Sequence, residues 1–112
     1  MDPRRERLAR NEAIFREVNE RVGEVAASFD LSGRGDFGVD FVCECGDAGC
    51  FEQVSLTLSE YREIRSSPIR FALVNGHADP EVDRVVASND RFATVEKKGE
   101  AATRAAELDP RT

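Results

Sequence analysis

Apolar residues recur through the first quarter of the chain at the spacing of an α-helix. They fall at Leu8, Phe15, Val18, Val22, Val25 and Phe29. After Phe15 the intervals alternate between three and four, which places these side chains on one face of a helix. Asp2 and Pro3 suit the cap and the first position of that helix. The pattern therefore predicts one helix from about residue 3 to residue 29, roughly 40 Å long at 1.5 Å per residue.

A helix of that length is long for a chain of 112 residues. Two arrangements would accommodate it. The helix lies across a sheet with its N-terminal end overhanging, or it pairs with the same helix of a second chain. Packing within the chain is the simpler arrangement, and homodimerisation through the overhang stays open.

Alternating residues after the helix predict a β-hairpin. In residues 39–45 the period of two places Val39, Phe41, Cys43 and Cys45 on one face and Asp40 and Glu44 on the other. A four-residue turn follows at 46–49, and residues 51–56 return as a second strand. Thr57 and Glu60 have the spacing of a capping box, so a second helix is expected from there to about Ser66.

The remaining pattern predicts two more strands and a third short helix. Residues 69–74 and 91–97 have the composition of strands. Asp79 and Pro80 resemble a helix start, and the valines that follow predict a short helix.

Together these elements predict an α+β fold, with a long N-terminal helix packed on a small antiparallel sheet and two short helices. We expect residues 1–97 to form a single zinc-binding domain. Residues 98–112 lack aromatics and are expected to be a mobile C-terminal tail, or a helix that forms only against a partner.

The candidate chemistry lies in three cysteines and the single histidine. Cys43, Cys45 and Cys50 form a C-x-C-x4-C pattern on the predicted hairpin, and His77 follows an Asn-Gly turn. Three thiolates and one imidazole complete a tetrahedral zinc shell without an open position, which is typical of a structural site. Iron is the next candidate, and three small buried cysteines without a metal are the simplest alternative.

Charge limits the classes of partner. The formal net charge is −6, and the excess lies in residues 30–60, where seven acidic residues accompany only Arg34. A phosphate backbone would be repelled by such a surface, so nucleic-acid binding is not expected. No apolar stretch reaches the length of a membrane span, and the charged start has no signal-peptide core, so we expect a cytoplasmic protein.

Several short stretches resemble a group of short, uncharacterised actinobacterial proteins. The matching stretches are Arg10-Asn11-Glu12, Phe15-Arg16, Val18-Asn19-Glu20, Phe41 to Cys45, Leu56 to Tyr61 and Gly76-His77. The resemblance implies a small cytosolic domain with a metal knuckle, and it implies no activity. The polar residues of the helix within these stretches are either partner contacts or solvated positions, and we favour solvated positions.

The sequence thus favours a small zinc-binding regulatory or adaptor protein that binds a protein partner, or itself, through the long helix. Two alternatives stay open. A metalloenzyme would need an open zinc position, with Glu44 or Asp47 acting on a bound water. A thiol-based redox sensor would release zinc on oxidation.

Overall fold

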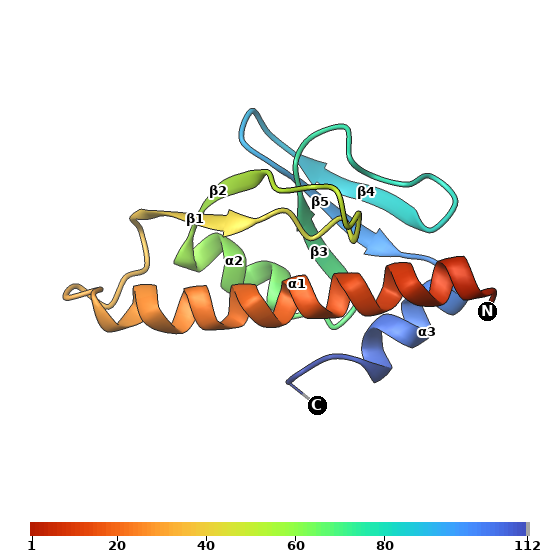
Figure 1. Cartoon of the computed structure of the whole chain (residues 1–112). Coiled ribbons are helices and arrows are strands. Elements are labelled where there is room, and N and C mark those ends of the chain that lie inside the picture. Colours follow the sequence, from red (N-terminus) through yellow and green to blue (C-terminus); the bar gives the residue numbers. More distant parts are fainter. Residues whose placement is uncertain (112) are drawn as a thin grey trace.

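The computed structural model describes residues 1–111, and its fold is α+β, as predicted (Figure 1). The elements in chain order are α1 (Pro3–Ser28), β1 (Gly38–Val42), β2 (Gln53–Thr57), α2 (Leu58–Arg65), β3 (Arg70–Leu73), β4 (Asp83–Ser88), β5 (Ala93–Lys97) and α3 (Gly99–Glu107).

The strands form two small antiparallel sheets instead of the single sheet that was predicted. One sheet is the β1–β2 hairpin, and the other has the order β3-β5-β4. In Figure 1, α1 runs along the length of the molecule beneath both sheets, and α3 lies against its N-terminal half. Because no strand in residues 1–111 connects the two sheets, other contacts must hold them together.

The caps of the first two helices are those that the sequence predicts. Asp2 accepts a hydrogen bond from the backbone N–H of Arg5 at 2.9 Å, and α1 extends to Ser28. The capping box of α2 is complete, since the Glu60 N–H donates to Thr57 Oγ1 and the Thr57 N–H donates to Glu60 Oε1.

The face of α1 that packs on the rest of the molecule is largely polar. Its buried residues are Ala9, Glu12, Arg16 and Asn19. The interpretation of Glu12, Arg16 and Asn19 as solvated positions is therefore wrong, whereas Arg10 is exposed. The apolar positions Val18, Val25 and Phe29 are exposed instead.

Each buried polar side chain of α1 has specific partners. The guanidinium of Arg16 donates to the carbonyls of Pro68 and Ala105, and it lies 4.4 Å from the centre of the Phe71 ring. Glu12 forms an ion pair with the buried Lys97. Hydrogen bonds and ion pairs thus hold the first two thirds of the helix, whereas Val22, Ala26 and Ala27 further along pack on the apolar core.

Two predicted segments take another form in the structure. Residues 83–88, part of the predicted third helix, form β4, because Asp79 closes a turn by accepting from Val82 and Asp83 N–H. The segment expected to be a mobile tail contains α3, which packs on α1 and β5 and buries Ala105. None of the three helices in residues 1–111 is long and apolar enough to cross a membrane.

Candidate metal centre

The four predicted ligands come together at one point between the two sheets. Cys43 and Cys45 follow β1, Cys50 precedes β2, and His77 lies in the connection from β3 to β4. Their ligand atoms all lie within 4.8 Å of one another. Ligand atoms around a tetrahedral zinc ion are expected to be about 3.5–3.8 Å apart. The distances from His77 Nδ1 to the sulfurs of Cys43 and Cys50, 3.6 and 3.7 Å, agree with this value. The group could therefore hold a metal ion.

The imidazole of His77 is oriented by a carboxylate on its other side. Nδ1 faces the sulfurs, and Nε2 lies 2.9 Å from Glu52 Oε2. A proton on Nε2 would be donated to Glu52, which leaves the Nδ1 lone pair directed at the sulfurs. Carboxylate partners of this kind are common around protein metal sites and fix the orientation of the imidazole. The sequence analysis did not identify Glu52, although its position two residues after Cys50 was a usable signal.

The surroundings of the thiols favour their neutral form when no cation is close. Burial raises the pKa of Cys43 to about 12 and also raises the pKa of Cys45. The Val74 N–H, 3.2 Å from the Cys43 sulfur, partly offsets the effect of burial. Coordination requires thiolates, so a divalent cation at this point would supply the compensating charge.

The ligand loop rests directly on α1 at Gly46. This glycine has φ +80°, and a Cβ here would lie 2.6 Å from Glu12 Cγ and 3.0 Å from the Leu8 carbonyl oxygen. Asn11 Nδ2 donates to the Gly46 carbonyl at 3.1 Å. Only glycine combines this backbone conformation with so close an approach, so α1 fixes the position of the loop that carries Cys45.

Asp47 shapes the turn between the ligands. Its carboxylate accepts from the Gly49 N–H at 2.8 Å, and its carbonyl accepts from the Cys50 N–H at 2.9 Å. These two bonds reverse the chain and return Cys50 to the other cysteines. The side chain is therefore engaged in loop structure.

Glu44, between two of the ligands, turns into the core. Its carboxylate accepts from Tyr61 Oη at 2.6 Å, from Asn19 Nδ2 at 2.9 Å and from the Ala72 N–H at 2.9 Å. The side chain is completely buried, and burial raises its pKa. Glu44 therefore ties the segment after β1 to α1, α2 and β3, and its carboxylate is directed into this core network.

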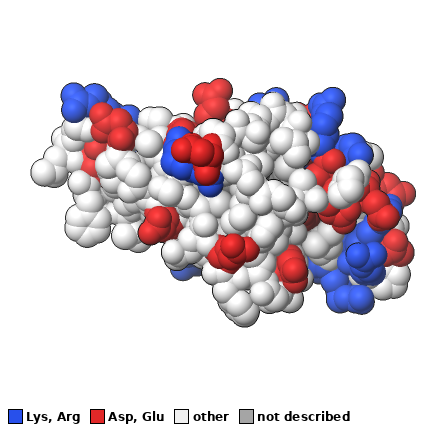
Figure 2. Space-filling model, turned by 90° about the horizontal axis from the view of Figure 1, so that it is seen from above, with Lys and Arg blue, Asp and Glu red and all other residues white. Residues whose placement is uncertain are grey.

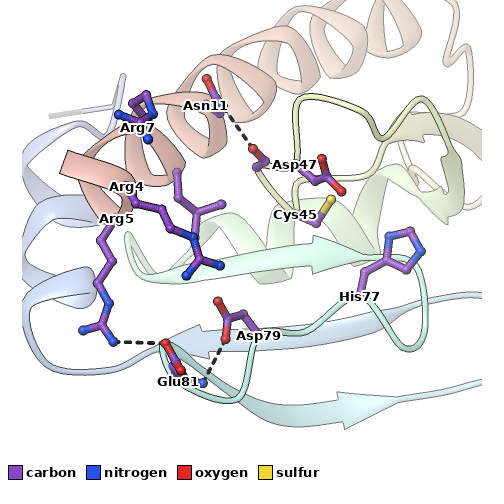
Figure 3. Close-up of a pocket in the computed structure, with 11 residues that line it drawn as sticks. Arg4, Arg5, Arg7, Asn11, Cys45, Asp47, His77, Asp79 and Glu81 are labelled. Carbon is purple, nitrogen blue, oxygen red and sulfur yellow. Dashed lines mark hydrogen bonds and ion pairs between the residues drawn. The ribbon is translucent and has the colours of Figure 1, made fainter. Parts of the chain in front are cut away.

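A cleft of about 600 Å³ opens beside Cys45 and His77. Figure 3 shows that Arg4 extends from α1 into this cleft and that Arg5 pairs with Glu81 on the opposite wall. Figure 2 shows basic and acidic side chains crowded at the end of the molecule where α1 begins. Residues 45–47 of the acidic segment thus share this cleft with Arg4, Arg5 and Arg7, which local sequence charge could not reveal.

The fold and the site define an α+β protein with a Cys3His group that could bind a metal. Comparisons of the chain with protein-family models, with curated proteins and with solved structures give no significant match. The resemblance to the actinobacterial group stays a prediction.

Proposed function

We propose that this protein is a small regulatory or adaptor protein that binds other proteins and is stabilised by a structural zinc ion. The observation that carries the proposal is the convergence of Cys43, Cys45, Cys50 and His77 within 4.8 Å. Four protein ligands fill a tetrahedral shell and leave no position for substrate or water. Sulfur and imidazole ligands favour zinc, with iron as the alternative metal.

The proposed role of the metal is to join the two sheets. Three ligands belong to the β1–β2 hairpin, and His77 follows β3 of the other sheet. A bound ion would therefore connect parts of the molecule that share no strand pairing. Small domains commonly use a metal in this way because their cores bury little apolar area.

A non-enzymatic role is supported by the acidic residues around the centre. Glu44 is turned into the core by three hydrogen bonds, and Asp47 holds the ligand turn. Glu44 and Asp47, the two carboxylates that could activate a metal-bound water, are thus both held in hydrogen bonds within the fold. A protein-binding role then agrees best with the exposed apolar residues of α1.

The proposal is tested by the metal content of protein purified without added metal. We expect close to one zinc per chain, and loss or weakening of binding in His77→Ala. Glu52→Gln should weaken zinc binding about tenfold through the orientation of His77. Glu63→Gln, the same change at an exposed glutamate of α2, is the matched control and should leave affinity unchanged. Absence of metal from the wild type would refute the proposal.

A redox sensor is the second candidate because Cys45 and Cys50 are only half-buried. Hydrogen peroxide could oxidise these two thiols to a disulfide, being itself reduced to two molecules of water, and the metal would lose two ligands. Zinc release after one equivalent of peroxide, followed with a chelating dye, would support this function. Retention of zinc under those conditions would favour the purely structural role.

A further inference from the structure

An exposed apolar stripe follows α1 from Ile14 to the C-cap residue Phe29. Ile14 is 56%, Val18 41%, Val25 60% and Phe29 75% exposed. Arg16 and Asn19, on the opposite side of the helix, are completely buried. Figure 1 shows α3 against the N-terminal half of α1, whereas no element lies below its C-terminal half. Within residues 1–111 the stripe is therefore uncovered.

We propose that this stripe is the interface of a two-fold symmetric homodimer in which α1 packs antiparallel against α1 of a second copy. The inference rests on the proposed protein-binding function and names its partner. The stripe stands apart from the metal centre, whose loop contacts the other end of α1 at Leu8, Asn11 and Glu12.

The spacing of the four apolar residues is self-complementary. Ile14 and Phe29 lie equally far from the point midway between Arg21 and Val22, and so do Val18 and Val25. A two-fold axis through that point places Ile14 against the partner's Phe29 and Val18 against the partner's Val25. A symmetric dimer requires such a surface, in which each contact occurs twice.

Charges beside the stripe favour the antiparallel direction. In an antiparallel pair of helices, residues on one side of the stripe face residues on the same side of the stripe in the partner helix. On one side lie Glu17, Arg21 and Glu24, so this side would keep charges of both signs together, with the partner's Glu24 about two residues along the axis from each Arg21. In a parallel pair this charged side would instead meet the uncharged side, which carries Val22 and Ala26.

The uncharged side is also hollowed to receive an apolar surface. A groove of about 470 Å³ is lined by Val18, Val22, Val25 and Ala26 of α1 and by Val39 of β1, with Arg21 at its edge. The stripe from Ile14 to Phe29 is roughly 22 Å long at 1.5 Å per residue. One helix pair of this length lies at the low end of interface sizes, so we expect a dissociation constant on the order of 10 µM.

Sedimentation analysis of the zinc-loaded protein across a concentration series tests the proposal. Val25→Glu should raise the dissociation constant at least about 100-fold, because the new charge would be buried without a partner. Val86→Glu, at an exposed valine of the edge strand β4, is the matched control and should leave association unchanged.

Orientation is tested with opposite charges at the two ends of the stripe. Ile14→Lys and Phe29→Glu should each weaken the dimer, and the double variant should restore it, because the two positions face each other in an antiparallel pair. A parallel pair would bring like charges together in the double variant, and association would stay weak.

A wild type that stays monomeric at all concentrations while carrying zinc would overturn the dimer and leave the metal centre intact. Dimers that are insensitive to Val25→Glu, or that are not restored by the double variant, would also overturn the proposed pairing. A wild type without zinc would instead refute the proposed function, so the two failures are distinguishable in the same samples.

Discussion

Replacement of Asn19 by alanine should be among the most destabilising single changes in α1. Asn19 Oδ1 accepts from the Val42 N–H at 2.9 Å, and Asn19 Nδ2 donates to the Val42 carbonyl at 2.8 Å. The Asn19 amide thereby pairs with both backbone hydrogen-bonding groups of Val42, the last residue of β1, as a neighbouring strand would. The same amide nitrogen also donates to Glu44 at 2.9 Å.

The magnitude follows from the groups left without partners. Each buried polar group that loses its only partner costs about 1–3 kcal/mol. Two backbone groups of Val42 and one lone pair of Glu44 are affected, and the Val42 contacts are only partly buried. We therefore expect a loss of about 3–5 kcal/mol in the free energy of unfolding. At about 4 °C per kcal/mol for a domain of this size, the midpoint falls by roughly 12–20 °C.

The assay is thermal and urea unfolding at a fixed free zinc concentration, because bound metal itself shifts the midpoint. Asn11→Ala is the matched control, since it removes one partly buried hydrogen bond to Gly46 from the same helix. Its cost should be about 1 kcal/mol. If Asn19→Ala is no more destabilising than Asn11→Ala, the argument that α1 is held by buried polar contacts is refuted.

Three further changes test other parts of the fold. Gly46→Ala should weaken zinc binding in a chelator competition assay and lower the free energy of unfolding by at least about 2 kcal/mol. Gly33→Ala is the control, because Gly33 also has a positive φ but a Cβ there would contact nothing. It should cost only about 1 kcal/mol and leave zinc affinity unchanged. Burial raises the pKa of Glu12 from 4.5 to about 7. The Glu12 carboxyl therefore loses its proton at lower pH in the unfolded chain than in the folded protein. Its contribution to the free energy of unfolding falls as the pH rises from 4.5 to about 7. Urea unfolding should accordingly show Glu12→Gln gaining stability relative to the wild type between those pH values, and a constant difference would contradict the assignment. Arg65→Met should cost about 3–5 kcal/mol by urea unfolding, because two carboxylates lose a buried partner, whereas the more exposed Arg111→Met should cost less than about 1 kcal/mol.

The sequence predicted the start of α2 and the convergence of the cysteines, because neighbouring residues determine both. The capping box of Thr57 and Glu60 set the start of α2, and glycines around the hairpin turn brought Cys43, Cys45 and Cys50 together. Side-chain and backbone preferences over a few residues decide such features.

The polar face of α1 could not be predicted because its partners are distant in the chain. Arg16 bonds to a carbonyl 89 residues further on, and Asn19 bonds to a strand 23 residues further on. Hydrophobic periodicity detected a real stripe, but Val18 and Val25 on that stripe are exposed. Nothing in the spacing itself says which side of a helix packs inward.

The third predicted helix failed for a different physical reason. Val85 and Val86 have branched side chains that favour strands, and pairing with β5 uses that preference. The Asp79-Pro80 signal was correctly recognised as a boundary, but it closes a turn that leads into β4.

The contact between Arg16 and the Ala105 carbonyl has a consequence for the order of events during synthesis. A nascent chain can form α1 early, yet one hydrogen-bond acceptor for this guanidinium emerges from the ribosome 89 residues later. Until then, the core cannot close around the charge without leaving Arg16 Nη2 buried and without its acceptor. The α1 face should therefore stay solvated while translation proceeds, and native packing should become favourable only after α3 has left the exit tunnel. Nascent chains stalled before residue 105 should remain protease-sensitive throughout α1. This includes the turns at Leu8, Asn11 and Glu12, which contact the ligand loop in the folded protein.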